Sequence, residues 1–225
     1  IHHISPIKNK DDIIWTIHLK MLILIGKLFY TGKLSYETIY STAGSSLPFE
    51  KRVYYKTILG ASLNTVIDYN EQNRYISGNV LTGKKLDENL FTGYFDSMVT
   101  VIPEPEKIEI LGWAMPGFNK LSRGRSFIAS FLNILRPKKY NENAGLHGGL
   151  RAFVATGIYE DVLPMDLYPI YLIKSILAED FDDMEGLGIY EVIEEDLALC
   201  EYIDPSKNNI QEILRQGLDL VLKEG

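Results

Sequence analysis

The sequence predicts an α+β protein in which a strand-rich segment is followed by a helical one. Residues 35–115 contain short runs of β-branched and aromatic residues separated by Gly, Asn and Ser, a pattern typical of strands joined by tight turns. Residues 151–225 instead carry apolar residues three and four positions apart, which predicts amphipathic helices. With 225 residues and 46% hydrophobic residues, the chain is long enough for one large domain or two small ones.

The first segment, residues 1–34, predicts one strand and one helix. Residues 13–17 are β-branched and aromatic, which indicates a short buried strand. Residues 18–30 are mostly apolar and precede Gly32, which predicts a helix that ends at this glycine. Because one strand and one helix do not make a domain, we expect residues 1–34 to be the tail of an α/β unit.

The second segment, residues 35–115, predicts a small sheet. Strand-like runs lie at residues 38–42, 52–56, 74–77, 98–102 and 107–113, and turn-forming residues separate them. Residues 57–66 are expected to form one short helix between strands. Several strands wrapped on one helix favour a compact β-grasp-like domain.

The third segment, residues 116–150, predicts a basic linker region. From Lys120 to Arg151 the chain has seven Lys or Arg residues and one acidic residue, Glu142. Residues 126–135 predict a short helix ended by Pro137, and the Asn- and Gly-rich residues 141–149 predict a loop. These basic residues could be solvated surface, or could face anionic lipid headgroups or an acidic partner, and the sequence leaves these possibilities open.

The last segment, residues 151–225, predicts a helical domain. A helix over residues 166–178 is expected to begin at Asp166 as N-cap, and residues 180–185 are expected to cap or begin the next turn. A short helix follows at residues 194–200. A final helix, capped by Asn208 or Asn209 and running through Val221, places five apolar side chains on one face: Ile210, Ile213, Leu214, Leu218 and Val221.

Charge and composition exclude several classes of protein. The net charge of −7 argues against a nucleic-acid partner bound through overall charge. One cysteine excludes an internal disulfide and fits a reducing compartment. No apolar run reaches the roughly 18 residues of a membrane-spanning helix. No signal peptide is evident and the first residue is not Met, so we expect a fragment of a longer protein.

The surroundings of Cys200 match the frame of an iron–sulfur site that lacks its thiolates. In the ferredoxin spacing C-x2-C-x2-C-x3-C-P, four cysteines hold the irons. Two stretches of this chain fit that spacing, each with its proline in place: Glu194, Leu197, Cys200, Asp204 and Pro205, and upstream Phe153, Thr156, Tyr159, Leu163 and Pro164. One thiolate cannot hold a cluster. The favoured interpretation of Cys200 is therefore a small buried apolar residue.

The other candidate metal and ligand sites are weak. His2 and His3 lie at a chain end, and His18 and His147 have no partner at ligand spacing. Residues 180–191 place acids at positions 1, 3 and 12 of a calcium-loop frame, but Glu185 occupies the position that requires glycine. The acidic stretch from Ser175 to Ser206 therefore favours a solvated or subunit-facing surface.

The glycine-rich residues 145–149 favour a flexible connector over a phosphate loop, because they lack the flanking strand and helix. No nucleophile–base pair or acid–base carboxylate pair can be argued from spacing. We assign no catalytic, cofactor-binding or metal-binding residue.

A collinear set of short motifs resembles one family along essentially the whole chain. The motifs are Ile14-Trp15-Thr16, Leu28-Phe29-Tyr30-Thr31-Gly32, Leu59-Gly60-Ala61, residues 74–83 (RYISGNVLTG), Leu111-Gly112-Trp113, residues 148–154 (GGLRAFV), Gly157-Ile158-Tyr159-Glu160, residues 164–169 (PMDLYP), residues 187–191 (LGIYE), residues 194–200 (EEDLALC) and Lys223-Glu224-Gly225. Together they resemble the C-terminal half of the A subunit of the bacterial Na⁺-translocating NADH:quinone oxidoreductases (Na⁺-NQR).

The resemblance implies a fold and a domain order. It implies the end of a Rossmann-like domain at residues 1–34, a soluble-ligand-binding β-grasp domain at residues 35–115, the basic linker region at residues 116–150, and a helical domain at residues 151–225. The helical domain would be a degenerate form of the iron–sulfur bundle of related flavoproteins. Family members often have Cys-Pro where this chain has Asp204-Pro205, and this departure removes any residual metal role for the pair.

The resemblance also implies a function. The protein would be peripheral, on the cytoplasmic face of the bacterial inner membrane, and in contact with the membrane surface and with the other subunits, above all the membrane-embedded B subunit. It would bind no cofactor itself and would help to form the site for quinone, a substrate of the complex. NADH, FAD, FMN, riboflavin and the iron–sulfur centre would be used by other subunits, and the fragment alone would be inactive. The alternative is a free-standing β-grasp module that binds a small soluble ligand.

Overall fold

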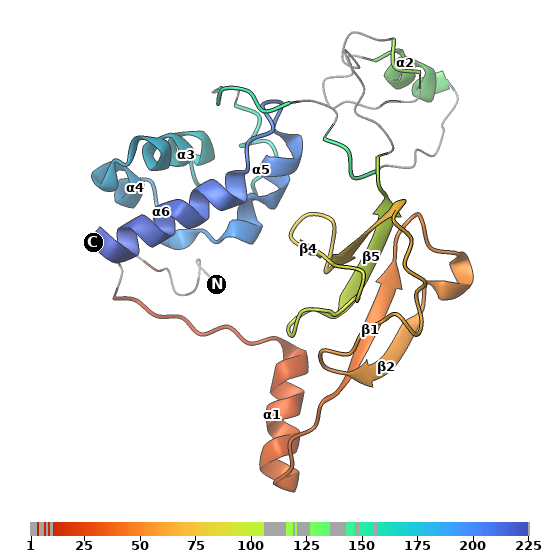
Figure 1. Ribbon diagram of the computed structural model, residues 1–225. Helices are drawn as coiled ribbons and strands as arrows, with labels where there is room; N and C mark the ends of the chain where they lie inside the picture. The colour runs from red at the N-terminus through yellow and green to blue at the C-terminus, as the bar shows by residue number, and fades with distance from the viewer. Residues whose placement is uncertain are drawn as a thin grey trace. The chain divides into compact units, whose positions relative to one another are not determined.

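In a computed structural model, the protein divides into two compact units. The structure describes residues 4, 7, 9, 11–105, 116–118, 120, 127–135, 143–146, 149–154 and 157–224. We call Ile17–Gly148 the sheet unit, and Ile1–Thr16 together with Gly149–Gly225 the helical unit. Strands occur in the first and most helices in the second (Figure 1), so the expected α+β class is confirmed.

The sheet unit is built on a mixed five-stranded sheet. Its strands are β1 (Glu37–Ala43), β2 (Tyr54–Ile58), β3 (Asn73–Ser77), β4 (Lys84–Lys85) and β5 (Met98–Pro103). They lie in the order β2-β1-β5-β3-β4, with β1 parallel to β5 and the other pairs antiparallel. This order, with parallel first and last strands at the centre, is the strand order of β-grasp folds.

Alternation along β1 turns one side of this strand toward the core of the unit. In β1 the even-numbered residues point inward, including Tyr40, because successive side chains of a strand face opposite sides. One core cluster joins side chains from strands and loops: Leu47, Leu63, Ile67, Tyr75, Leu86, Leu90, Val99 and Val101. The turn after β1 needs Gly44, because φ is +119° there and a Cβ would lie 1.9 Å from the Val101 carbonyl oxygen.

The prediction of a helix over residues 57–66 is wrong. β2 runs on to Ile58 and turns follow, with Gly60 at a φ of +75°, a conformation that ends regular structure. Leu63 still reaches the core, and its amide donates to the Leu90 carbonyl oxygen at 3.2 Å. An irregular loop therefore supplies the apolar contacts that we expected from a helix.

The other sheet predictions differ from the structure only locally. The strands expected at residues 38–42, 74–77 and 98–102 are confirmed as β1, β3 and β5. The run at 52–56 forms a strand two residues later, and a residue pair between the expected strands forms the short edge strand β4. The strand expected at 107–113 lies outside the described residues.

The N-terminal part of the sheet unit is the helix α1 (Leu19–Thr31), which confirms the expected helix. Gly32 ends it in the left-handed region, and its amide donates to the Leu28 carbonyl oxygen at 2.8 Å. Lys20 ties the helix to the unit by donating to the Asp96 carbonyl oxygen at 3.1 Å. Most of the apolar side chains of α1 are exposed, and only Leu24 is buried.

The prediction of a buried strand at residues 13–17 is wrong. These residues have no strand assignment, and Trp15 is 92% exposed. A strand needs a neighbour to pair its backbone groups, and no described strand pairs with this stretch. The β-forming composition is present, but the structure shows no partner for it within the described residues.

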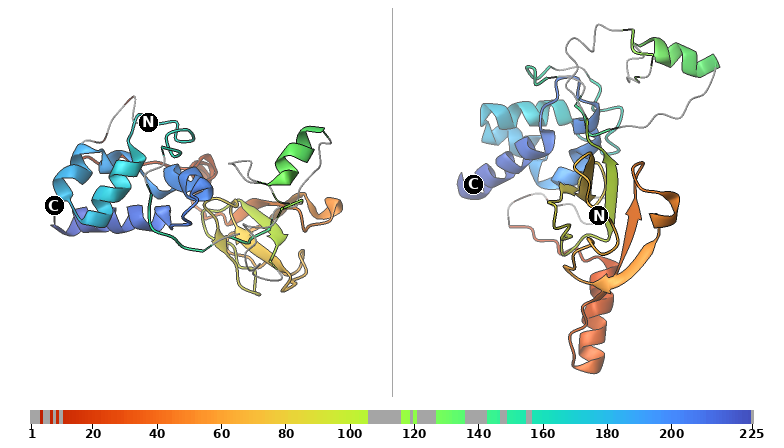
Figure 2. Two further views of the ribbon diagram at one scale, coloured as in Figure 1. Left: turned by 90° about the horizontal axis from the view of Figure 1, so that it is seen from above. Right: turned by 45° about the vertical axis from the view of Figure 1, so that its right-hand side comes forward.

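The helical unit packs short helices around one apolar cluster. Its elements are α3 (Pro169–Ala178), α4 (Phe181–Gly186), η2 (Ile189–Glu191), η3 (Glu194–Leu197), α5 (Ala198–Ile203) and α6 (Ile210–Glu224). The views from two directions show α3 to α6 gathered side by side (Figure 2). The cluster includes Tyr159, Leu172, Ile173, Met184, Leu197, Cys200, Ile210 and Leu214.

Helices occur in each predicted stretch, but the helix predicted at residues 194–200 is the 3-10 helix η3 followed by α5, and the first helix starts later than predicted. α3 begins at Pro169 and not after Asp166, because proline favours the first helical position and restricts the residue before it. Asp180 caps α4 by accepting from the Asp183 amide at 3.1 Å. The expected apolar face of α6 is the face that packs into the cluster.

The short helix in the basic linker region is also confirmed, as α2 (Ile128–Leu135). In the part of the chain that the structure describes, no helix combines the length and the apolar character needed to cross a bilayer.

Candidate functional site

The sheet unit contains an open hollow of about 640 Å³. Its lining comes from the turn after β1, from the loop before β3, and from β3 and β5. The lining residues are Ser46, Leu47, Pro48, Lys51, Ile67, Asp68, Tyr69, Asn70, Glu71, Gln72, Asn73, Tyr75 and Val101. Most of these side chains are polar, and the apolar ones are continuous with the core cluster of this unit.

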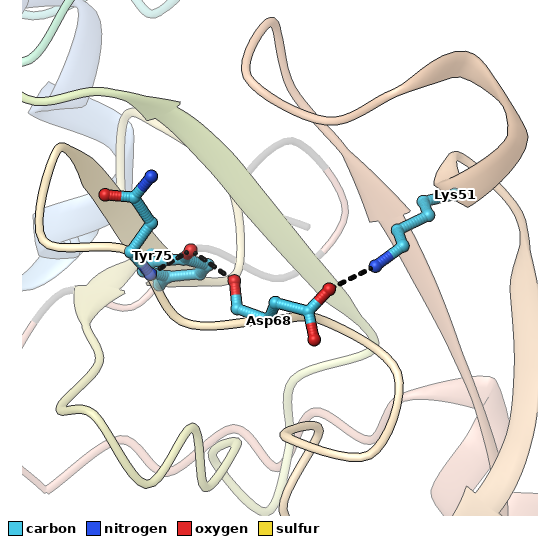
Figure 3. Close-up of polar contacts among 4 residues, drawn as sticks. Lys51, Asp68 and Tyr75 are labelled. Carbon is cyan, nitrogen blue, oxygen red and sulfur yellow. Dashed lines mark hydrogen bonds and ion pairs between the residues drawn. The ribbon is translucent and has the colours of Figure 1, made fainter.

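A network of hydrogen bonds organises one side of the hollow (Figure 3). The Lys51 ammonium lies 2.9 Å from the Asp68 carboxylate. The Tyr75 hydroxyl donates to the Asp68 carbonyl oxygen at 2.9 Å and accepts from the Asn70 amide at 2.9 Å. The Tyr69 and Tyr75 rings stack with their centres 5.2 Å apart. The loop before β3 is therefore held in a defined shape although it has no regular secondary structure.

The hollow contains an ion pair, between Lys51 and the exposed Asp68. The hydrogen bond to Lys51 lowers the pKa of Asp68, and the same bond raises the pKa of Lys51. Both groups stay charged near neutral pH, and neither is placed as a proton donor or acceptor for catalysis. A stacked aromatic pair, one ion pair and several amide side chains suit the binding of a small polar molecule. This site was not predicted from the sequence, because the run from Asp68 to Asn73 has the composition of an ordinary surface turn.

The two cysteine-like frames meet in the helical unit. Tyr159 of the upstream frame and Cys200 of the downstream frame are both buried in the same cluster. The Cys200 thiol lies 4.0 Å from the Tyr159 carbonyl oxygen. Leu163 and Leu197 belong to the same cluster, and Phe153 packs against it. Thr156 lies outside the described residues.

The fourth position of the downstream frame, Asp204, has a backbone role. Its buried carboxylate accepts from the Ser206 amide at 3.1 Å and from the Asn208 amide at 2.8 Å. It also accepts from the Asn208 side-chain nitrogen at 3.0 Å. The carboxylate thus fixes the turn that leads into α6.

Cys200 and Tyr159 are not poised for chemistry. Burial raises the pKa of the Cys200 thiol to about 11, so the reactive thiolate is scarce at neutral pH. Burial and the nearby Asp204 carboxylate raise the pKa of Tyr159 well above its ordinary value. Within the described part of the chain the Tyr159 hydroxyl lacks a well-formed hydrogen bond. These side chains fill space in the core, as expected for Cys200.

The remaining candidates do not form a site. Among the described residues no group of three or more His, Cys, Asp or Glu side chains is arranged to hold a metal ion. His18 is exposed and precedes α1, whereas His2, His3 and His147 lie outside the described residues. The calcium-loop frame at 180–191 is α4 followed by η2. The glycine-rich residues 145–149 are described only in part.

Several acids of the 175–206 stretch bind within their own unit. Glu201 accepts from the Gln211 amide at 2.8 Å, and Glu185 accepts from the Tyr190 hydroxyl at 2.6 Å. Glu194 forms an ion pair with Arg215. The solvated or subunit-facing acidic surface stays a prediction, since Glu185 is exposed, and these three carboxylates also bond within the unit.

Comparison with known proteins gives a consistent result. Residues 41–88, within the sheet unit, match the family described as the NQRA C-terminal domain. Over its whole length the chain is 39% identical to the A subunit of the Na(+)-translocating NADH-quinone reductase of Pasteurella multocida, 36% identical to that of Vibrio parahaemolyticus and 38% identical to that of Actinobacillus pleuropneumoniae.

The chain spans about half the length of these relatives, with 50%, 50% and 49% of each covered. The matched stretch includes both the sheet unit and the helical unit, since all of the chain is aligned. The resemblance stated from the motifs is thereby confirmed: this chain is homologous, from end to end, to about half of the A subunit of the Na⁺-translocating NADH-quinone reductases.

Proposed function

We propose that this chain is part of a peripheral subunit of a membrane complex that couples NADH oxidation and quinone reduction to Na⁺ export. The observation that carries the proposal is the sequence identity of 36% to 39%, over the whole of this chain, with half of the A subunits of such reductases. The chain itself would perform no chemistry. It would bind other subunits, above all the membrane-embedded B subunit on the cytoplasmic face, and would help to shape the quinone site.

We further propose that the helical unit descends from an iron–sulfur bundle and binds no cofactor. The contact between Tyr159 and Cys200 supports this idea, because it brings the two emptied frames into one core. Leucine, tyrosine and phenylalanine at the former ligand positions would stabilise the unit by apolar packing, at roughly 25 cal/mol per Å² buried.

The N-terminal residues support a place beside a further domain. The stretch 13–17 has strand composition without a described strand partner, and α1 exposes Leu22, Ile23 and Phe29. An apolar helix next to a strand-forming segment is what the end of a Rossmann-like unit provides. We propose that the preceding part of the full-length protein pairs with this segment and covers α1.

The direct test of this function is purification of the intact complex through an affinity tag on the subunit that contains this chain. Flavin-containing membrane subunits should co-purify with it, together with NADH:quinone reductase activity. Purification of the tagged protein without any of these partners would overturn the proposal.

A second test uses the 225-residue chain by itself. It should be colourless, with no iron and no flavin, and its quinone affinity should be weak or absent. We expect weak binding because the proposed quinone site also depends on the B subunit and on the rest of the full-length protein. A visible absorbance band from bound cofactor, or sub-micromolar quinone binding, would contradict the proposal.

The alternative function is that of a β-grasp module that binds a small soluble ligand. The hollow beside Lys51, Asp68 and Tyr75 favours it, because the whole site lies within the sheet unit. Calorimetric titration with pools of small polar metabolites tests this function. Tight binding that Tyr69→Ala weakens at least about tenfold would support it, whereas Phe49→Ala, outside the lining, serves as the control. Absence of binding in every pool would remove this alternative and leave the role in the reductase complex unaffected.

A further inference from the structure

The helix α2 displays its apolar face outward. Ile128, Phe131 and Leu132 share one face, since they are three and four residues apart. All three are exposed, Phe131 to 66%, and the neighbouring Ile134 is exposed to 72%. Ala129, in the same first turn, is fully buried. A surface helix normally turns its apolar stripe toward the core, so this orientation needs a second apolar partner.

The base of α2 is anchored to the protein. The Ile128 amide donates to the Pro116 carbonyl oxygen at 3.0 Å. Gly117 has a φ of +64°, and a Cβ there would lie 2.3 Å from the Phe127 ring. The Lys120 ammonium lies 6.0 Å from the centre of the same ring. The first turn is therefore held by packing that only glycine permits at position 117.

The sequence around α2 is strongly basic. Residues 120–139 contain six Lys or Arg residues and no Asp or Glu, in a chain with a net charge of −7. Three of the six precede the helix and three follow it: Lys120, Arg123, Arg125, Arg136, Lys138 and Lys139. The apolar face is thus bracketed by positive charge on both sides along the chain.

We propose that α2 docks this chain on an anionic lipid surface, with Ile128, Phe131, Leu132 and Ile134 buried among the acyl chains. Helices that lie in the membrane interface combine bulky apolar side chains with Lys and Arg, and in this chain the Lys and Arg residues precede and follow α2. Anionic headgroups attract the flanking cations. An acidic protein surface would match the cations but not the apolar face between them. This inference rests on the proposed function, because it specifies how that peripheral protein meets the bilayer.

The test follows a fluorophore placed on α2 of the 225-residue chain. Ile134→Cys is labelled with an environment-sensitive maleimide. The matched control is Phe49→Cys, because the Phe49 side chain is 80% exposed and lies elsewhere in the sheet unit. Cys200 is buried and stays unlabelled. With vesicles of phosphatidylethanolamine and phosphatidylglycerol, the label at position 134 should brighten and shift to the blue. The label at position 49 should change little.

Flotation of the unlabelled chain gives an independent measurement. It should bind phosphatidylglycerol vesicles, bind phosphatidylcholine vesicles at least about tenfold more weakly, and be released by salt. Phe131→Ser combined with Leu132→Ser should lower binding at least about tenfold, whereas Phe49→Ser should leave it unchanged. Circular dichroism checks that each variant is folded.

Three outcomes would overturn the inference. They are failure to bind anionic vesicles, equal binding by the double variant, and a change at position 134 that grows with protein concentration in the absence of lipid. The last would identify a second copy of the chain as the partner of α2. Co-purification with the complex does not depend on these results, so failure of lipid binding with intact co-purification would remove only the role of α2.

Discussion

At the scale of single residues, the positions of the two cysteine-spacing frames have structural roles. Asp204 accepts three hydrogen bonds at the turn before α6, and Tyr159 and Cys200 pack in the core. The burial of Cys200 was correctly predicted, because a lone thiol cannot hold a cluster and cysteine packs well in cores. The role of Asp204 was not predicted, because a carboxylate shows its hydrogen-bond donors only once the backbone has folded around it.

Replacing Asp204 by cysteine should destabilise the helical unit. In Asp204→Cys the amides of Ser206 and Asn208 lose their acceptor, at a cost of about 1–3 kcal/mol in the free energy of unfolding. Urea denaturation followed by circular dichroism under reducing conditions measures this. Asp204→Asn should lose less, and Glu195→Cys, a site outside this turn, should stay within about 0.5 kcal/mol. A stable Asp204→Cys variant would show that the turn does not need the carboxylate.

The ion pair between Arg74 and Glu104 predicts a pH dependence. Two hydrogen bonds of 2.7 and 2.8 Å join these side chains, and the hydrogen bond from Arg74 lowers the pKa of Glu104. A lowered pKa in the folded state adds stability above the unfolded-state value of about 4.3, and this contribution is lost as the pH falls through the folded-state pKa. Glu104→Gln should therefore cost about 0.5–1 kcal/mol near neutral pH for this partly exposed pair.

The difference between Glu104→Gln and the unaltered chain should shrink toward zero in acid. Urea midpoints measured from neutral pH down to about pH 3 follow this change. Glu37→Gln is the matched control, because its pair with Lys56 is longer, at 3.2 Å, and more exposed. A difference that stays constant over the whole pH range would mean that the charge of Glu104 has no part in it.

At the scale of elements, local patterns predicted helices well and loops poorly. α1, α2, α4 and α6 were expected from apolar spacing and end signals, which are encoded within each segment. Part of the loop between β2 and β3 was expected to be a helix, because its apolar residues Leu63 and Val66 have helical spacing. The burial of Leu63 is decided by contacts with residues that are distant in sequence. The prediction of a strand at residues 13–17 was wrong because a strand requires a partner strand, which its own residues do not specify.

The contact between α3 and α6 depends on Gly217. A Cβ at this position would lie 2.7 Å from the Ile176 side chain. Gly217→Ala should gain about 1 kcal/mol of helix propensity but lose about 1–3 kcal/mol through overpacking, so the net effect should be destabilising. Thermal unfolding measures it.

Gly186→Ala is the matched control for this contact, because nothing lies within 4 Å of a Cβ there. That variant should be neutral or slightly stabilising. In the Gly217→Ala background, Ile176→Ala should cost less than it does in the unaltered chain, since the two positions interact. Equal stabilisation by both glycine substitutions would show that α3 and α6 are less closely packed.

At the scale of the whole molecule, each unit has a core of its own. The apolar cluster of the sheet unit lies between residues 47 and 101, and that of the helical unit lies between residues 153 and 221. The order of a strand-rich part before a helical part was predictable from composition, and the collinear motifs predicted the family. The hollow was not predictable, because the stretch that supplies most of its lining has the composition of an ordinary surface turn.

Separate cores predict separate folding. Residues 149–225 made alone should unfold cooperatively, with a midpoint within about 5 °C of the helical transition in the whole chain. Ile173→Ala, at a fully buried site, should lower the free energy of unfolding by about 2–5 kcal/mol. The midpoint temperature should fall equally in the isolated segment and in the whole chain. Thermal scans by circular dichroism test this. Loss of the cooperative transition in the isolated segment would mean that the rest of the chain is needed for its stability.

The hollow beside Tyr75 owes most of its lining to one short stretch, Ile67 to Asn73, which leads into the ladder of β3. Substitutions at most of these residues would leave nearly all of the paired residues of the sheet unchanged. Sequence changes in this loop can therefore alter which ligand the hollow binds while the sheet stays the same, as in the binding loops of antibodies.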